Sequence, residues 1–157
     1  DFFLGSAEHL QIVKQKSSLP ILRKDFIIHE YQIYEARILD ADCILLIASI
    51  LNDEQIADFI DVARSLNLDC LMEVHDQDEL NRIESIKDVI IGVNNRNLKT
   101  FEVDISLSVT LKNSYQGDNP FVAESGIKSK EDLDYLMNNG INNFLIGESL
   151  MKKNLQI

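Results

Sequence analysis

The stretch Cys43-Ile44-Leu45-Leu46-Ile47 is apolar at every position. A strand that is apolar on both faces is typical of a parallel sheet, because helices cover both sides of such a sheet. Similar short apolar runs recur along the chain at spacings of roughly 20–30 residues, the length of one strand–helix unit. The sequence therefore predicts strands at 20–24, 43–47, 69–74, 89–93, 120–123 and 143–146.

The segments between these runs carry the periodicity of helices, most clearly at 53–65, where Asn52 and Gln55 form a capping-box pattern. The predicted helices are 7–15, 31–39, 53–65, 76–86, 104–113 and 129–139. Alternating strands and helices predict an α/β fold with a parallel sheet. Periodicity does not distinguish an open doubly wound sheet from a (β/α)8 barrel. Because a whole barrel usually needs about 250 residues, the length of 157 residues favours the open sheet.

The composition, 45% hydrophobic and 26% charged, is that of an ordinary globular protein. The net charge of −11 argues against nucleic acid and anionic membrane as partners, since both need a basic face. It leaves room for a small anionic substrate, which responds to the local field of its pocket. Cys43 and Cys70 each lie in an apolar run and are expected to be buried, reduced thiols.

The ends of the chain and its apolar runs bear on its location. No apolar run approaches the about 20 residues of a membrane span, and no signal peptide is visible, so we expect a cytoplasmic protein.

The chain begins Asp1-Phe2-Phe3, without an initiator Met, and ends at Ile157 just after a helix-like start. We therefore expect a piece of a longer polypeptide.

Polar residues follow nearly every predicted strand. In parallel α/β folds, sites lie at the carboxyl ends of the strands, where the βα loops supply functional residues. A single polar residue there can simply be solvated or cap the next helix, but clusters after five strands predict one shared site. These clusters are Lys24-Asp25, Glu73 with His75, Asn94-Asn95-Arg96, Glu124-Ser125 and Gly147-Glu148-Ser149.

Lys24 and Glu73 are the candidates for proton transfer. In a strand, Lys24 shares a face with Leu22 and Glu73 shares a face with Leu71, so each side chain would stand at the rim of an apolar interior. An amine or a carboxylate in such a place suits acid–base catalysis. Alternatively, Lys24 only ends its strand and reaches water, and Glu73 pairs with a neighbouring cation.

Asn94 and Arg96 are candidates for substrate binding. Asn94 shares a face with Gly92, which would leave room for a ligand, and the Asn94 amide can hydrogen-bond a hydroxyl group; alternatively it forms an Asx turn. Arg96 can pair with a carboxylate or lie on the surface.

Two glycine-bearing turns, Glu124-Ser125-Gly126 and Gly147-Glu148-Ser149, come last. Each lies between a strand and a helix and can present backbone N–H groups to a phosphate. The last two βα loops of a barrel are a frequent phosphate site, although glycine is common after any strand. Other motifs are missing: the chain has no P-loop, no G-x-G-x-x-G and no G-x-S-x-G. Its histidines and cysteines lack zinc-site spacing, so no metal is expected.

Six motifs occur in order over nearly the whole chain. They are Leu22-Arg23-Lys24-Asp25-Phe26-Ile27, Tyr31-Gln32-Ile33-Tyr34-Glu35-Ala36-Arg37, Met72-Glu73-Val74-His75-Asp76, Ile91-Gly92-Val93-Asn94-Asn95-Arg96-Asn97-Leu98, Glu124-Ser125-Gly126-Ile127 and Ile146-Gly147-Glu148-Ser149-Leu150-Met151. Together they resemble indole-3-glycerol phosphate synthase, an enzyme family of tryptophan biosynthesis. The resemblance implies a (β/α)8 TIM barrel and so overrides the open sheet. The chain would be a single domain over 1–157, an incomplete barrel of about six βα units that lacks the first two strands and the N-terminal extension.

The resemblance also implies a reaction. This carboxy-lyase closes the ring of 1-(2-carboxyphenylamino)-1-deoxyribulose 5-phosphate, with loss of CO₂ and water, to give indole-3-glycerol phosphate, and it needs no cofactor or metal. Lys24 would protonate the ribulose carbonyl, and Glu73 would transfer the second proton, during dehydration. The implied substrate-binding residues are Asn94 and Glu124 for hydroxyls, Arg96 for the anthranilate carboxylate, and Phe26 and Leu45 for the aromatic ring. The implied phosphate-binding residues are Ser125, Gly126, Gly147 and Glu148.

The family also has a first-strand lysine that this chain does not contain. A six-stranded remnant would have two open edges, through which it would pair with a complementary piece or with itself. One alternative is therefore an inactive folding or assembly fragment of the enzyme. A weaker alternative is a phosphate-binding barrel like phosphoribosylanthranilate isomerase, which is expected to use a Cys/Asp pair instead of Lys24 and Glu73.

Overall fold

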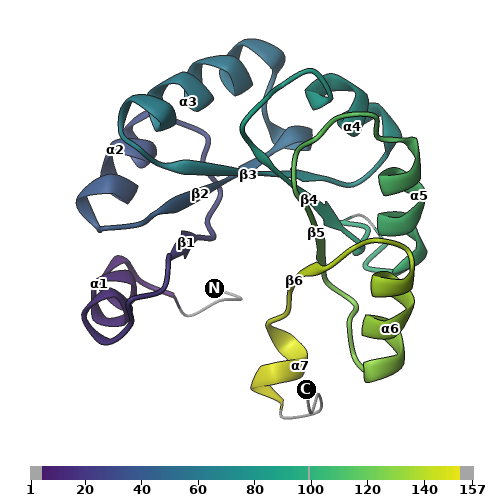
Figure 1. Cartoon of the computed structure of the whole chain (residues 1–157). Coiled ribbons are helices and arrows are strands. Elements are labelled where there is room, and N and C mark those ends of the chain that lie inside the picture. Colours follow the sequence, from purple (N-terminus) through teal and green to yellow (C-terminus); the bar gives the residue numbers. More distant parts are fainter. Residues whose placement is uncertain (1–4, 99, 153–157) are drawn as a thin grey trace. The chain divides into compact units, whose positions relative to one another are not determined.

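The computed structural model describes residues 5–98 and 100–152. In these residues, six strands alternate with helices (Figure 1). The strands follow one another in the sheet in the order β1-β2-β3-β4-β5-β6. A doubly wound sheet reverses its strand order at a switch point, and this sheet has no reversal. The order is that of a (β/α) barrel, so the fold is α/β and represents an incomplete (β/α)8 barrel. The preference for an open sheet drawn from chain length alone is wrong.

The chain forms two compact units, residues 1–71 and 72–157. The first unit contains α1 (Ala7–Lys16), β1 (Leu22–Arg23), α2 (Tyr31–Ile38), β2 (Cys43–Ile47), the 3-10 turn η1 (Ala48–Ile50), α3 (Asp53–Ser65) and the start of β3 (Asp69–Val74). The second contains the rest of β3, then α4 (Gln77–Ile83), β4 (Ile90–Asn94), α5 (Ser106–Ser114), β5 (Phe121–Glu124), α6 (Lys130–Asn138), β6 (Asn143–Leu145) and α7 (Glu148–Met151).

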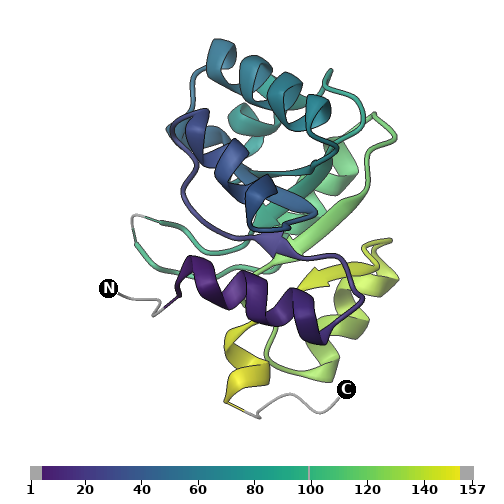
Figure 2. The same cartoon turned by 90° about the vertical axis from the view of Figure 1, so that its left-hand side faces the viewer.

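In the first unit, β1 and β2 pair in parallel, with Leu22 opposite Cys43. Helices α2 and α3 lie side by side (Figure 2). The predicted capping box of α3 is confirmed: Asn52 Oδ1 accepts from the Gln55 backbone N–H, and the Gln55 side chain accepts from the Asn52 N–H. Of the two free cysteines, Cys70 is buried as predicted, whereas Cys43 is only partly buried.

The first strand is shorter than predicted. It ends at Arg23, so Lys24 follows the strand instead of belonging to it. At its start, the backbone N–H of Ile21 donates to the side chain of Asp42 instead of to a neighbouring strand. The loop that follows Lys24 is held by the side chain of Gln32, whose Oε1 accepts from the N–H groups of Ile28 and His29 and whose Nε2 donates to the carbonyl of Phe26.

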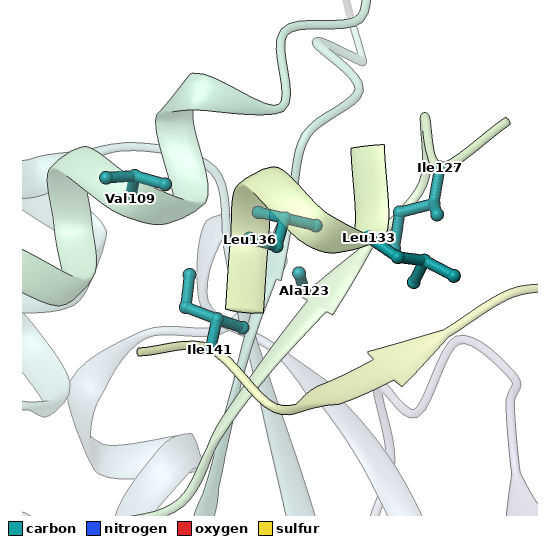
Figure 3. Close-up of a cluster of buried hydrophobic side chains, with 6 residues drawn as sticks. All are labelled: Val109, Ala123, Ile127, Leu133, Leu136 and Ile141. Atoms are coloured by element: carbon teal, nitrogen blue, oxygen red, sulfur yellow. The ribbon is translucent and has the colours of Figure 1, made fainter. Parts of the chain in front are cut away.

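The second unit has its core between the sheet and the helices. Strands β4, β5 and β6 pair in parallel in register, with Asn94 opposite Glu124. Ala123 of β5 lies among apolar side chains of α5, α6 and the loops next to them (Figure 3). This cluster consists of Val109, Ala123, Ile127, Leu133, Leu136 and Ile141.

Three predicted helices begin later than expected. Helix α6 begins at Lys130 because Ser129 is its N-cap. Helix α4 begins at Gln77 because Asp76 is its N-cap, where it accepts a hydrogen bond from the Glu79 N–H. Helix α5 begins at Ser106 because Asp104 Oδ1 accepts from both the N–H and the hydroxyl of Ser106. An acceptor side chain that bonds forward in this way favours a cap over a helix interior. Within the described ranges, no helix has the length and apolarity needed to span a membrane.

Candidate active site

Three polar side chains gather at the carboxyl ends of neighbouring strands in the second unit. Because Ala123 faces the helices (Figure 3), the next residue, Glu124, faces the other side of the sheet. Asn94 is in register with Glu124 on the adjacent strand and shares that face. Glu73, Asn94 and Glu124 are 3%, 9% and 1% exposed. Buried polar residues of this kind are uncommon outside functional sites or fully bonded networks.

Glu73 and Asn94 are in direct contact. The Asn94 Nδ2 donates a hydrogen bond of 3.0 Å to Oε1 of Glu73. The Oδ1 of the same amide accepts from the backbone N–H of Arg96, at 3.1 Å. Asn94 therefore forms the Asx turn that the sequence offered as the alternative, and it also supports the Glu73 carboxylate. Its hydrogen bond to a substrate hydroxyl stays a prediction.

His75 is a member of this cluster to which the sequence assigned no role. Its Nε2 lies 3.2 Å from Oε1 of Glu73, an ion-pair contact outside hydrogen-bond geometry. On the other side of the ring, Oε2 of Glu79 lies 3.2 Å from Nδ1 and accepts from the His75 backbone N–H at 2.8 Å. Two spacings could have revealed this arrangement: Glu73-x-His75 across the end of β3, and Glu79 in the first turn of α4, the helix that follows.

The charge of His75 follows from these contacts. Burial by itself would lower the pKa of the imidazole, but the carboxylates of Glu73 and Glu79 outweigh burial and raise the pKa to about 9. At neutral pH the ring is therefore an imidazolium, and a positive charge faces the Glu73 carboxylate.

The turn after β5 has a left-handed backbone. Ser125 and Gly126 have φ values of 62° and 81°. A Cβ on Gly126 would lie 2.3 Å from Cγ1 of Val103, so this position requires glycine for both conformation and space. Asn95, which is buried, donates to the Ser125 carbonyl at 3.2 Å and accepts from the N–H and hydroxyl of Ser108. The turn is thus held by a residue that the sequence left without a role.

The turn after β6 is linked to the turn after β5. The hydroxyl of Ser149 donates to the Ile127 carbonyl at 2.6 Å, which brings the two predicted phosphate turns together. Gly147 has a negative φ of −109° and nothing within 4 Å of an added Cβ. The Glu148 carboxylate contacts Lys152 at 2.7 Å and Arg96 at 3.4 Å. The hydrogen bond from Lys152, reinforced by its charge and that of Arg96, lowers the pKa of Glu148.

The remaining predicted residues lie in the first unit. Lys24 directly follows β1 and is exposed, Phe26 is 61% exposed, and Leu45 is buried in β2. The face shared by Leu22 and Lys24 within one strand is therefore not formed. Arg23, the neighbour of Lys24, is buried and pairs with Glu35 at 2.6 Å.

Among the described residues, no three His, Cys, Asp or Glu side chains come close enough together to hold a metal ion. The chemistry available in the second unit is that of carboxylates, an imidazolium, an amide, a guanidinium and backbone N–H groups. This set suits proton transfer next to a bound anion.

Comparisons with known proteins agree with these observations. The family model for indole-3-glycerol phosphate synthase matches residues 1–156. A protein of that name from Legionella pneumophila (strain Paris) is 49% identical over 152 residues, covering 97% of this chain and 59% of the relative. A protein of the same name from Ruminiclostridium cellulolyticum is 47% identical over 152 residues, which cover 97% of this chain and 58% of the relative. The chain thus spans about three-fifths of the length of these relatives.

Solved structures show the same fold at low sequence identity. The N-acetylmannosamine-6-phosphate 2-epimerase from Clostridium perfringens matches with a TM-score of 0.72 at 16% identity, over 92% of this chain and 70% of that one. A chain of the tryptophan synthase a2b2 complex from Pyrococcus furiosus matches with a TM-score of 0.70 at 17% identity. This match covers 93% of our chain and 63% of the Pyrococcus chain. The family model and the curated relatives, together with this fold, establish that the chain belongs to the indole-3-glycerol phosphate synthase family.

Proposed function

We propose that this chain supplies the catalytic strand ends of an indole-3-glycerol phosphate synthase. The reaction joins the aromatic carbon that bears the carboxylate to C2 of the ribulose unit, releases CO₂, and then expels the C2 oxygen as water while C1 loses a proton. The product is indole-3-glycerol phosphate. In these terms the enzyme is a carboxy-lyase, and its substrate is a small phosphorylated carboxylate.

One observation carries the proposal: the buried Glu73 carboxylate, held by Asn94 at the carboxyl ends of β3 and β4. A carboxylate fixed at this edge of the sheet suits proton transfer in the dehydration step. Glu124 lies in register with Asn94 and, like it, suits the substrate hydroxyls. Arg96 suits the anthranilate carboxylate, because its guanidinium already contacts the Glu148 carboxylate and can exchange one carboxylate for another.

The phosphate is proposed to bind at the turns after β5 and β6. Left-handed backbone at Ser125 and Gly126 leaves N–H groups available for an anion, as in other phosphate-binding turns. The hydrogen bond from Ser149 to Ile127 keeps this turn beside Gly147 and Glu148. Because the Glu148 side chain is anionic and occupied by Lys152 and Arg96, its contribution to phosphate binding comes from the backbone.

In the first unit, Lys24 is the proposed acid that protonates the ribulose carbonyl as the aromatic ring attacks. Its exposure is compatible with contact to a substrate. Phe26, also exposed, offers an aromatic face to the substrate ring, and Leu45 is the proposed apolar wall. These roles come from the family resemblance together with the places of the residues beside β1 and in β2.

The test is whether the complete native polypeptide forms indole-3-glycerol phosphate. The reaction is measured by the increase in indole absorbance and fluorescence. Lys24→Ala is expected to lower kcat by at least about 100-fold, the usual contribution of a general acid, and Glu73→Gln should have a comparable effect. Lys16→Ala, an exposed lysine on α1, and Glu54→Gln, an exposed acid on α3, are the matched controls. Near-normal turnover by Lys24→Ala would remove Lys24 from the mechanism.

An intact mass of the native protein separates the enzyme from an inactive fragment. A mass near that of a whole barrel, with turnover, supports the proposed function. A mass that corresponds to these 157 residues, with no indole formed, supports a folding or assembly fragment instead.

A further inference from the structure

We infer that His75, held in place by Glu79, is a positioning residue that keeps the Glu73 carboxylate oriented and ionised for proton transfer. The inference rests on the proposed function, because that function gives Glu73 its role in the reaction. In this arrangement, Glu79 on α4 contacts His75 and holds its ring, and His75 contacts Glu73 at the end of β3.

Geometry is the first support. Glu79 contacts His75 twice, through the ring Nδ1 at 3.2 Å and through the backbone N–H at 2.8 Å. The double contact fixes both the ring and the chain that carries it. With Nδ1 bound to a carboxylate, the ring keeps a proton on that nitrogen. The opposite nitrogen, Nε2, is then directed to Glu73, at 3.2 Å from Oε1.

The kind of contact is the second support. The approach of Nε2 to Glu73 is outside hydrogen-bond geometry, so its value lies in charge. The charged groups that act on the imidazole are Glu73 on β3 and Glu79 on α4, and both favour its protonated form. A cation in contact with a buried carboxylate opposes the effect of burial, which on its own would drive that carboxylate to the neutral acid.

Asn94 completes the arrangement. It donates to the same Oε1 that His75 faces, so an amide and an imidazolium stabilise one oxygen of Glu73. With these two contacts on one oxygen, the inferred role of Glu73 is that of a proton acceptor. In the dehydration it would take the proton that leaves C1 of the former ribulose, while the departing hydroxyl receives a proton from another acid and leaves as water.

The first experiment needs no enzyme activity. The imidazole signals of His9, His29 and His75 in the complete polypeptide are followed by NMR as the pH is raised. In the wild type His75 should titrate well above 6.5, and Glu79→Gln should lower its midpoint by at least one pH unit. Asp78→Asn removes a charge from the same exposed turn of α4 without touching the ring and should leave the midpoint within a few tenths of a unit. A wild-type midpoint near 6.5, or one unmoved by Glu79→Gln, overturns the inference.

The second experiment uses turnover by the complete polypeptide. His75→Gln keeps an N–H donor but removes the charge. We expect kcat to fall about tenfold with little change in KM, and the acidic limb of the pH profile of kcat to move to higher pH. His9→Gln, an exposed histidine on α1, is the matched control. A His75→Gln enzyme with unchanged kcat and an unchanged acidic limb contradicts the inference, whereas absence of turnover in the wild type contradicts the proposed function itself.

Discussion

The side-chain amide of Asn95 donates a hydrogen bond to the backbone carbonyl of Ser125, at 3.2 Å. Asn95 is 2% exposed, and its Oδ1 accepts from the N–H and the hydroxyl of Ser108. Asn95→Ala would leave these buried groups without their partner, at a cost of about 1–3 kcal/mol each. With three such groups, we expect the free energy of unfolding, measured by urea denaturation, to fall by at least about 3 kcal/mol.

The matched control for Asn95 is Asn138→Ala. Asn138 is exposed at the end of α6, where alanine is well tolerated. If Asn95→Ala lowers the free energy of unfolding no more than Asn138→Ala does, the hydrogen bonds of Asn95 do not hold the turn at Ser125.

Gly126→Ala is expected to destabilise the fold more than Gly140→Ala. Both glycines have left-handed φ values, 81° and 79°, so both variants pay the conformational cost of about 1 kcal/mol. Only at Gly126 does the added Cβ meet a neighbour, the Val103 side chain, whereas Gly140 has nothing within 4 Å. Overpacking adds about 1–3 kcal/mol. Unfolding of each variant in urea checks the difference.

A double variant tests the cause of the Gly126 effect. Val103→Ala removes the methyl group that an alanine at 126 would meet, so the pair should lose less stability than the two single changes added together. Strict additivity would show that the backbone conformation alone explains the cost.

The stability of the protein should fall as the pH rises from about 6.5 to about 9. The contacts with Glu73 and Glu79 raise the pKa of His75 from 6.5 in an unfolded chain to about 9, so in this window the folded protein binds the extra proton. The contribution of His75 to the free energy of unfolding is complete below pH 6.5 and is lost as the pH rises to about 9, with a total on the order of 3 kcal/mol. Thermal melting across this range checks the prediction. His75→Gln should flatten the profile, and an equally steep profile in that variant would assign the slope to other groups.

Gln32→Ala should loosen the segment after β1. The Gln32 side chain bonds the N–H groups of Ile28 and His29 and the carbonyl of Phe26. Without it, the two amides should exchange with solvent about tenfold faster, as expected for the loss of a hydrogen bond of about 1.4 kcal/mol. Gln15→Ala on α1 is the control. Unchanged exchange at Ile28 and His29 would show that other contacts hold the segment.

The sequence predicted most of the fold because its signals are local. The apolar stretch 43–47 became β2 over the predicted range, and helix α3 has both its predicted bounds and its capping box. The prediction failed at the start of the sheet, where 20–24 was expected to be a strand and only Leu22–Arg23 is one. There the N–H of Ile21 is bonded by the side chain of Asp42, and the loop beyond Lys24 is bonded by the side chain of Gln32. Strand periodicity contains no information about such partners.

In the candidate site, too, local patterns predicted some residues and missed others. Local patterns identified Glu73, Asn94 and Glu124 as strand-end residues, and all three are buried side chains of the second unit. The roles of Lys24, Phe26, Leu45 and the phosphate turns stay predictions that the activity measurements will decide. Sequence reasoning gave no role to His75 or Asn95, because a polar residue in a loop looks the same whether it is solvated or buried.

By itself, the sequence determined the alternation of strands and helices, the family and the residue types at the strand ends, because these follow from periodicity and from ordered motifs. Only the tertiary structure decided which polar groups meet: Asn94 and His75 at Glu73, and Asn95 at Ser125. The contacts of Asn94 with Glu73 and of Asn95 with Ser125 join residues from different segments of the chain, and the charge and burial of all three contacts depend on neighbours that the local sequence does not specify.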